Sequence, residues 1–102
     1  MSEAKQRAAT FRLKDFQRIS EANAEAMTRG VLSMWTVYDH PADHPEGFIA
    51  RRFEVGKGQT TATTDTVSAS SIIELRAMFD ICGMFRLPRH DEDEPPIVET
   101  WL

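Results

Sequence analysis

The sequence predicts an α+β domain, in which a small, mostly antiparallel sheet of four or five strands packs on one helix and an N-terminal helix is added. Three observations lead to this class. Apolar residues recur at spacings of three and four in two segments, which is typical of helices. β-branched and aromatic residues dominate several shorter segments, as in strands with one wet face. The 102 residues fit one domain with one modest core, and the expected order is α-β-β-(β)-α-β-β.

The first predicted element is a helix over 14–29. Its recurring apolar positions are Phe16, Ile19, Ala22 and Ala26. Gly30 follows where a helix commonly ends. Because the apolar stripe is narrow and rich in alanine, we expect this helix to be loosely attached, either covering a sheet face or pairing with a second copy. Residues 1–12 show no strong pattern, so we expect a flexible N-terminus before a single domain over 13–102.

A β-hairpin with a long polar loop is predicted next. Its strands cover 31–38 and 48–55, where β-branched and aromatic residues are frequent. Pro41 and Pro45 cannot donate to a central ladder, so the first strand should end near Asp39.

Shorter elements complete the predicted sheet. The segment 63–68 is rich in threonine, which suits a short strand at the edge. The segments 85–87 and 97–101 are expected to pair as a closing hairpin, because an unpaired apolar chain end would promote aggregation.

The second helix is predicted over 71–82. Ser71 and Glu74 have the spacing of a capping box, in which the serine hydroxyl accepts from the Glu74 amide. Gly83 then ends the helix.

We expect one core, with the two tryptophans as neighbours across the sheet. Arg51 and Arg52 must face opposite sides of their strand, so one of them lies near the core. Such an arginine either extends its charged end to solvent or pairs with a carboxylate, for which Glu99 is the candidate. The expected core residues are Trp35, Val37, Ile49, Phe53, Ile72, Leu75, Phe79, Leu87, Val98 and Trp101.

The loop of the first hairpin holds the clearest candidate site. The triplet Asp-His-Pro occurs twice in it, and carboxylates and imidazoles are suitable ligands for Zn²⁺ or another divalent ion. The candidates are Asp39, His40, Asp43 and His44, with His90 from a second polar loop. The prolines disfavour a helix that would align two imidazoles, and a third ligand must come from elsewhere, so a structural turn is favoured. The same Asp-His pairs leave acid/base chemistry open.

Composition narrows the possible partners and the compartment. The net charge is −4, which disfavours a general nucleic-acid binder, although five of the first 18 residues are basic. Cys82 is the only cysteine, so no intrachain disulfide is possible, and a buried thiol in a reducing cytoplasm is expected. No apolar run approaches the roughly 20 residues of a membrane span, so no membrane partner is expected.

Two stretches of the chain carry a resemblance. They are WTVYDHPADHPEGFIARRF and the ending LPR…EPPIVETWL. With them, residues 34–102 resemble a group of small bacterial proteins of no assigned activity that share a W-T-[VI]-Y-D-x-P start, an ARR-like second strand and a terminal IVE-x-W. The resemblance implies a compact domain in a bacterial cytoplasm, and it implies no catalytic residue.

Three classes of function remain open. The favoured one is a non-catalytic interaction or regulatory module that binds an unknown protein or a second copy. The alternative is a metal-assisted or acid/base enzyme that uses the histidine loop, which is disfavoured because no nucleophile or phosphate-binding motif is recognisable. The last is an accessory nucleic-acid binder that uses the basic N-terminal segment with Arg51 and Arg52.

Overall fold

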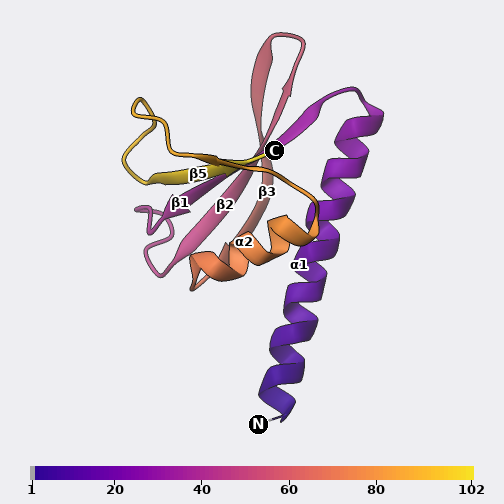
Figure 1. Cartoon of the computed structure of the whole chain (residues 1–102), viewed down its shortest axis with the longest axis vertical. Helices are drawn as coiled ribbons and strands as arrows, with labels where there is room; N and C mark the ends of the chain where they lie inside the picture. Colours follow the sequence, from indigo (N-terminus) through magenta and orange to yellow (C-terminus); the bar gives the residue numbers. More distant parts are fainter. Residues whose placement is uncertain (1) are drawn as a thin grey trace.

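The computed structural model describes residues 2–102, and the side chains of residues 13–102. The elements, in chain order, are α1 (Ser2–Thr28), β1 (Leu32–Asp39), β2 (Phe48–Gly56), β3 (Gln59–Ala69), α2 (Ile72–Ile81), β4 (Arg86–Pro88) and β5 (Ile97–Trp101) (Figure 1). The strands form one five-stranded sheet of order β3-β2-β1-β5-β4, in which every neighbouring pair is antiparallel. The predicted α+β class is confirmed. None of the described helices is long and apolar enough to cross a membrane.

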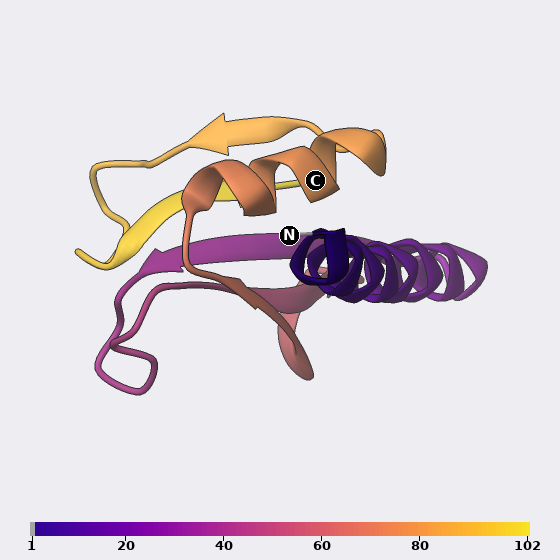
Figure 2. The ribbon, with the colours of Figure 1, turned by 90° about the horizontal axis from the view of Figure 1, so that it is seen from below.

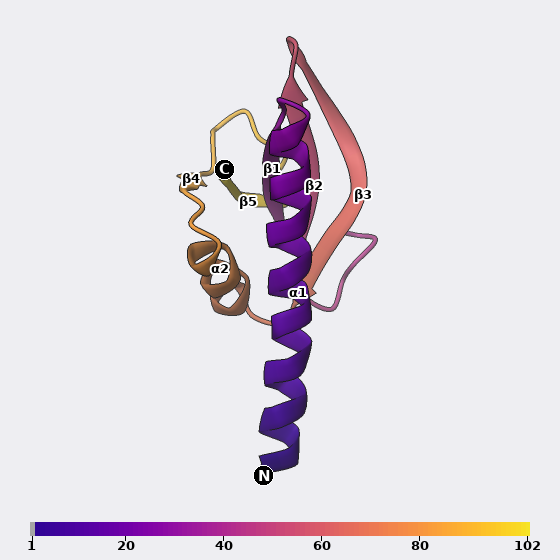
Figure 3. The same cartoon turned by 90° about the vertical axis from the view of Figure 1, so that its right-hand side faces the viewer.

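Helix α1 is longer than the predicted helix over 14–29. It begins at Ser2, and its N-terminal part projects beyond the rest of the molecule (Figures 1 and 3). This part has no apolar periodicity but is rich in Ala, Glu, Lys, Gln and Arg, which favour a helix by propensity alone. The predicted flexibility of residues 1–12 is untested. Nearer its C-terminus the helix docks on the sheet, where Ile19 and Ala26 are fully buried.

The two hairpins were predicted with nearly correct strands. In the first, Trp35 pairs with Arg52 and Val37 pairs with Ala50. The turn between β2 and β3 uses positive φ angles at Lys57 (53°) and Gly58 (74°), a geometry that matches the twist of paired strands.

The expected third strand over 63–68 is also an edge strand, but it is longer, because β3 starts at Gln59. Between its two paired stretches, residues 63–65 lie opposite the single residue Arg52, which makes a bulge.

Helix α2 begins as predicted but with a different cap. The Ser71 hydroxyl accepts from the Ile73 amide at 3.2 Å rather than from the amide of Glu74. At the other end Gly83 has a φ of +75°, and the Met84 amide returns to the Phe79 carbonyl at 3.1 Å.

The closing hairpin is confirmed by the pairing of Arg86 with Trp101 and of Leu87 with Thr100. Trp35 and Trp101 are neighbours in register across β1 and β5, as expected. The Phe79 ring of α2 packs on both indoles, with centroid distances of 5.7 Å and 5.4 Å.

Both helices cover the same face of the sheet (Figures 2 and 3). The core lies between them and that face, and its buried residues are Ile19, Trp35, Val37, Ala50, Val67, Ala69, Leu75, Met78, Phe79 and Trp101. Ile72 packs at its margin.

Two predicted core positions are wrong. Phe53 belongs to the face that no helix covers, because the register puts Ala50 and Arg52 beside Val37 and Trp35. Ile49 lies on that same face but is buried, as predicted. Leu87 lies on the edge strand β4 and is 45% exposed. Ile49, Phe53 and Val55 do share one face of β2, as predicted, but the helices pack on the other face of the strand. Val98 is half-buried.

Candidate interaction surface

The histidine loop and the second polar loop lie at the same end of the sheet. The Asp39 amide donates to the Pro96 carbonyl at 2.8 Å, which ties the beginning of one loop to the end of the other. His40 lies at a positive φ of 46°, and its Nδ1 contacts the carboxylate of Asp39. His44 Nδ1 lies 3.3 Å from a carboxylate oxygen of Glu46.

The candidate ligands are engaged with their neighbours. Asp43 accepts from Arg51 at 2.5 Å, and His90 Nδ1 accepts from the Glu92 amide at 3.1 Å. Within the described side chains no three His, Cys, Asp or Glu residues come together in a way that could hold a metal ion. The metal site at Asp39, His40, Asp43, His44 and His90 stays a prediction without geometric support.

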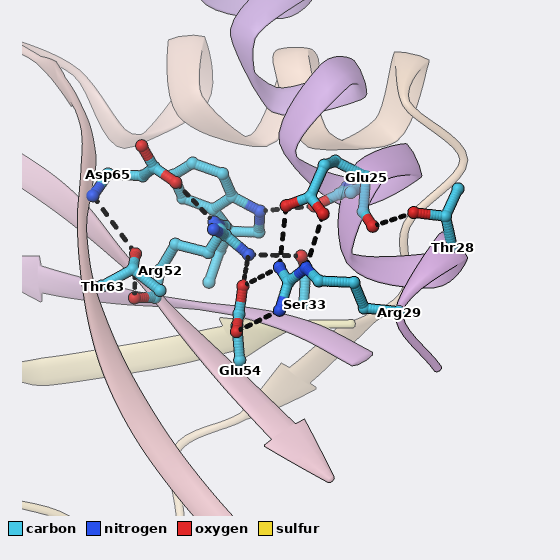
Figure 4. Close-up of polar contacts among 10 residues, drawn as sticks. Glu25, Thr28, Arg29, Ser33, Arg52, Glu54, Thr63 and Asp65 are labelled. Atoms are coloured by element: carbon cyan, nitrogen blue, oxygen red, sulfur yellow. Dashed lines mark hydrogen bonds and ion pairs between the residues drawn. The ribbon is translucent and has the colours of Figure 1, made fainter. Parts of the chain in front are cut away.

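Of the two strand arginines, Arg52 is the inward one. It is buried, and it donates to Asp65 at 2.7 Å, to Ser33 at 3.0 Å and to Glu54 at 3.1 Å (Figure 4). The bulge in β3 makes this possible, because it brings both Asp65 and Thr63 opposite Arg52.

Glu99, which we expected to pair with the inward arginine, pairs with Arg76 instead. It is 2% exposed and accepts from Arg76 of α2 at 2.7 and 3.1 Å. The Trp101 indole also donates to it at 2.9 Å. The prediction failed because Arg76 comes from the covering helix, and strand pairing alone cannot show which helix residue lies above β5.

An ion pair between Arg29 and Glu54 attaches the C-terminal end of α1 to the sheet. Arg29, directly after α1, donates to Glu25 of that helix and, at 3.0 and 2.5 Å, to Glu54 on β2 (Figure 4). These hydrogen bonds from Arg29, with those from Arg52, lower the pKa of Glu54 to about 2. The polar groups on the covered face thus hold the helices in place.

The groove at the C-terminal end of α1 does not have the character of a small-molecule site. It has a volume of about 440 Å³ and lies where α1 ends, β1 begins and the chain leaves α2. Its polar side chains are already used inside the chain. Asn23 accepts from the Trp35 indole at 3.0 Å, Ser33 accepts from Arg52, and Cys82 lies 3.5 Å from the Ser20 hydroxyl. No set of unused polar groups converges among the described lining residues to orient a ligand.

Cys82 is a poor nucleophile. It is half-buried, as expected for a structural thiol, and burial raises the pKa of the thiol above its ordinary value. The thiol is therefore protonated at neutral pH, whereas the thiolate is the reactive form.

The second face of the sheet carries no helix, and we call it the open face. Residues that pair across strands share a face, so the register shows which side chains lie there. Ala62, Phe53 and Met34 form one register row across β3, β2 and β1. Leu102 and Phe85 continue this row, since Leu102 follows the Trp35–Trp101 pair and exchanges backbone hydrogen bonds of 2.8 and 2.9 Å with Phe85. We call these five residues the apolar row.

The apolar row is widened on one side and bordered by a mixed row on the other. The Leu32–Val55 pair extends it toward the start of β1. In the next register row Arg51 lies between Thr66 and Thr36, and Thr100 and Leu87 follow on β5 and β4. Thr36, beside Arg51, is buried even without a covering helix.

Charge is nearly absent from the open face. Arg51 is the one charged side chain on it among the described strands, and it is paired with Asp43. Its guanidinium also lies 5.3 Å from the centre of the Tyr38 ring. Burial is the main cause that raises the pKa of Tyr38, so the phenol stays neutral. The side chain of Phe85, an uncharged residue at the far end of the apolar row, is 77% exposed to solvent.

This surface was not recognised from the sequence. Its signal was the apolar alternation of Met34, Phe53 and Val55, which we assigned in part to the core. The counter-signal was the run of charges at Arg52 and Glu54 on the other face of β2, which normally marks the wet side of a strand.

Comparisons with known proteins leave the function to be argued from geometry. No protein-family model, no curated protein and no solved structure matches the chain. The resemblance to small bacterial proteins stays a prediction.

Proposed function

We propose that the chain is a non-catalytic protein-interaction module that binds its partner through the open face. One observation carries the proposal: an uncharged row of apolar side chains crosses the sheet on the side that no helix covers. Contiguous apolar surface of this kind is unfavourable in water and typical of a binding site.

The chemistry of the face supports a protein partner. Large residues such as Phe85, Phe53 and Met34 are the types that dominate the cores of protein interfaces. Nucleic acid needs unpaired cations, and the one arginine on this face is already paired with Asp43. The lone, half-buried Cys82 supports a cytoplasmic location.

The proposal is tested by photo-crosslinking of the full chain inside cells. Phe85 is replaced by the photoreactive p-benzoylphenylalanine, and the matched control carries it at Ile73. Ile73 is 72% exposed, but it lies on α2 on the opposite side of the sheet. We expect a discrete adduct of higher mass from position 85 and none from position 73. No adduct from position 85, or the same adducts from both positions, would overturn the proposal.

A further inference from the structure

We infer that the partner is a second copy of this chain, and that two sheets pack face to face through their open faces. This inference rests on the proposed function and names its partner. It follows from three properties of the open face: its breadth, its apolar row and its charge.

The breadth of the face calls for a flat cover. Half-buried and exposed apolar side chains reach from Val55 on β2 to Leu87 on β4. Five strands at about 4.8 Å give a width of roughly 24 Å, and the eight residues of β1 at about 3.3 Å give a length of roughly 26 Å, which shortens toward β5 and β4. One helix, about 10 Å wide, would leave more than half of it in water. A second sheet would cover it completely, and its corrugated surface approaches the roughly 800 Å² per partner of a standard interface.

The apolar row suits a copy of itself. It crosses all five strands, from Ala62 on β3 to Phe85 beside β4. A twofold axis places the same patch on both partners, so the apolar row of each copy can lie against that of the other. Facing sheets pack with interdigitated side chains about 10 Å apart.

The charge of the face also permits self-association. The whole chain carries a net charge of −4, so two copies repel each other at long range. On the open face, however, no strand residue that the structure describes is acidic, and Arg51 is neutralised by Asp43. Burying this face against itself therefore leaves no unpaired charge out of water.

The inference is tested by sedimentation equilibrium of the purified chain from about 1 to 500 µM. We expect a transition from the 11.6 kDa monomer to twice that mass. Phe85→Asp should weaken the dimer at least about tenfold, because it places a charge in the buried row. The control Ile73→Asp should leave the dissociation constant unchanged, since its side chain is equally exposed on α2.

A second measurement uses the wild-type chain and so does not depend on the folding of a variant. Oxidation of Met34, in the apolar row, by hydrogen peroxide should slow as the protein concentration rises through the transition. Met27 is 76% exposed on α1 and should oxidise at a constant rate.

Two outcomes would overturn the inference. A dimer that Phe85→Asp does not weaken, with Met34 unprotected, uses another surface. A chain that stays monomeric to 500 µM does not self-associate. If that monomer still gives an adduct of a different mass from position 85 in cells, the proposed function stands and the partner is another protein. Without any adduct, both fail.

Discussion

The two faces of the sheet differ in where their charged side chains lie, and on β2 the usual order of polarity is reversed. The covered face holds the charged side chains of Arg52, Glu54 and Glu99 beneath the helices. The open face holds Phe53, Met34 and Phe85 without a helix above them. Strands usually bury their apolar side and expose their charged side. The difference teaches that the folded chain buries only part of its apolar surface, and the proposed partner would bury the remainder.

The covered face can bury its charged side chains because each of them is paired with a side chain of opposite charge. Arg76 on α2 donates to Glu99, and Arg29, directly after α1, donates to Glu54. A buried pair of this kind contributes little net stability compared with apolar packing, but losing one partner is costly. The ion pairs therefore specify where each helix sits, and the apolar cluster around Phe79 supplies most of the stability.

The largest expected effect is a difference in the free energy of unfolding between a substitution under the covered face and one on the open face. Phe79→Ala removes the ring between the two indoles, and we expect it to lower the free energy of unfolding by about 3–5 kcal/mol. Phe85→Ala should change it by less than about 0.5 kcal/mol in the monomer. Urea denaturation below the dimerisation range measures both. Equal losses would show that the open face belongs to the monomer's core.

A smaller effect is expected on the covered face from Glu99→Gln. The change keeps the shape but leaves Arg76 without its charged partner, and we expect a loss of about 2 kcal/mol in the free energy of unfolding. This is less than the roughly 3–5 kcal/mol of a fully buried pair, because the Arg76 side chain is 36% exposed. Arg76→Met with Glu99→Gln should recover much of the loss in the same denaturation assay, because the glutamine oxygen still accepts from the Trp101 indole. A stability unchanged by Glu99→Gln would mean that the pair does not fix α2.

The smallest effect is a pH dependence at the end of α1. The pKa of Glu54 is about 2 in the folded chain and near 4.5 when unfolded, so its contribution is complete above pH 4.5. It is lost progressively as the pH falls from 4.5 toward 2. Glu54→Gln should flatten the dependence of the unfolding free energy on pH within that window. The control Glu46→Gln, in the exposed loop, should retain the slope. Equal slopes in wild type and Glu54→Gln would contradict this.

Local patterns predicted most of the fold. Helix α2, both hairpins and the adjacency of Trp35 and Trp101 follow from apolar periodicity, capping residues and turn residues that lie close together in the sequence. The start of α1 at Ser2 was missed, because the segment before residue 14 is helical by propensity and has no apolar face to reveal it.

The candidate site could be predicted only in part. The favoured class, an interaction module, was proposed from the sequence, but the surface was not. The histidine loop was predicted as a metal site because histidine and aspartate can be identified in a sequence as possible ligands. Whether such side chains converge on one point depends on the geometry of the loop. In the structure His44, Asp43 and His90 each bind a near neighbour.

The sequence by itself determined which residues alternate, and hence which side chains share a face of each strand. It could not determine which face the helices cover, because alternation is symmetric and both faces of β2 carry apolar residues. That choice was made by the tertiary structure, through Arg76 on Glu99, Arg29 on Glu54 and Phe79 between the indoles. These contacts join residues far apart in the chain, so the alternation within a single strand cannot encode them.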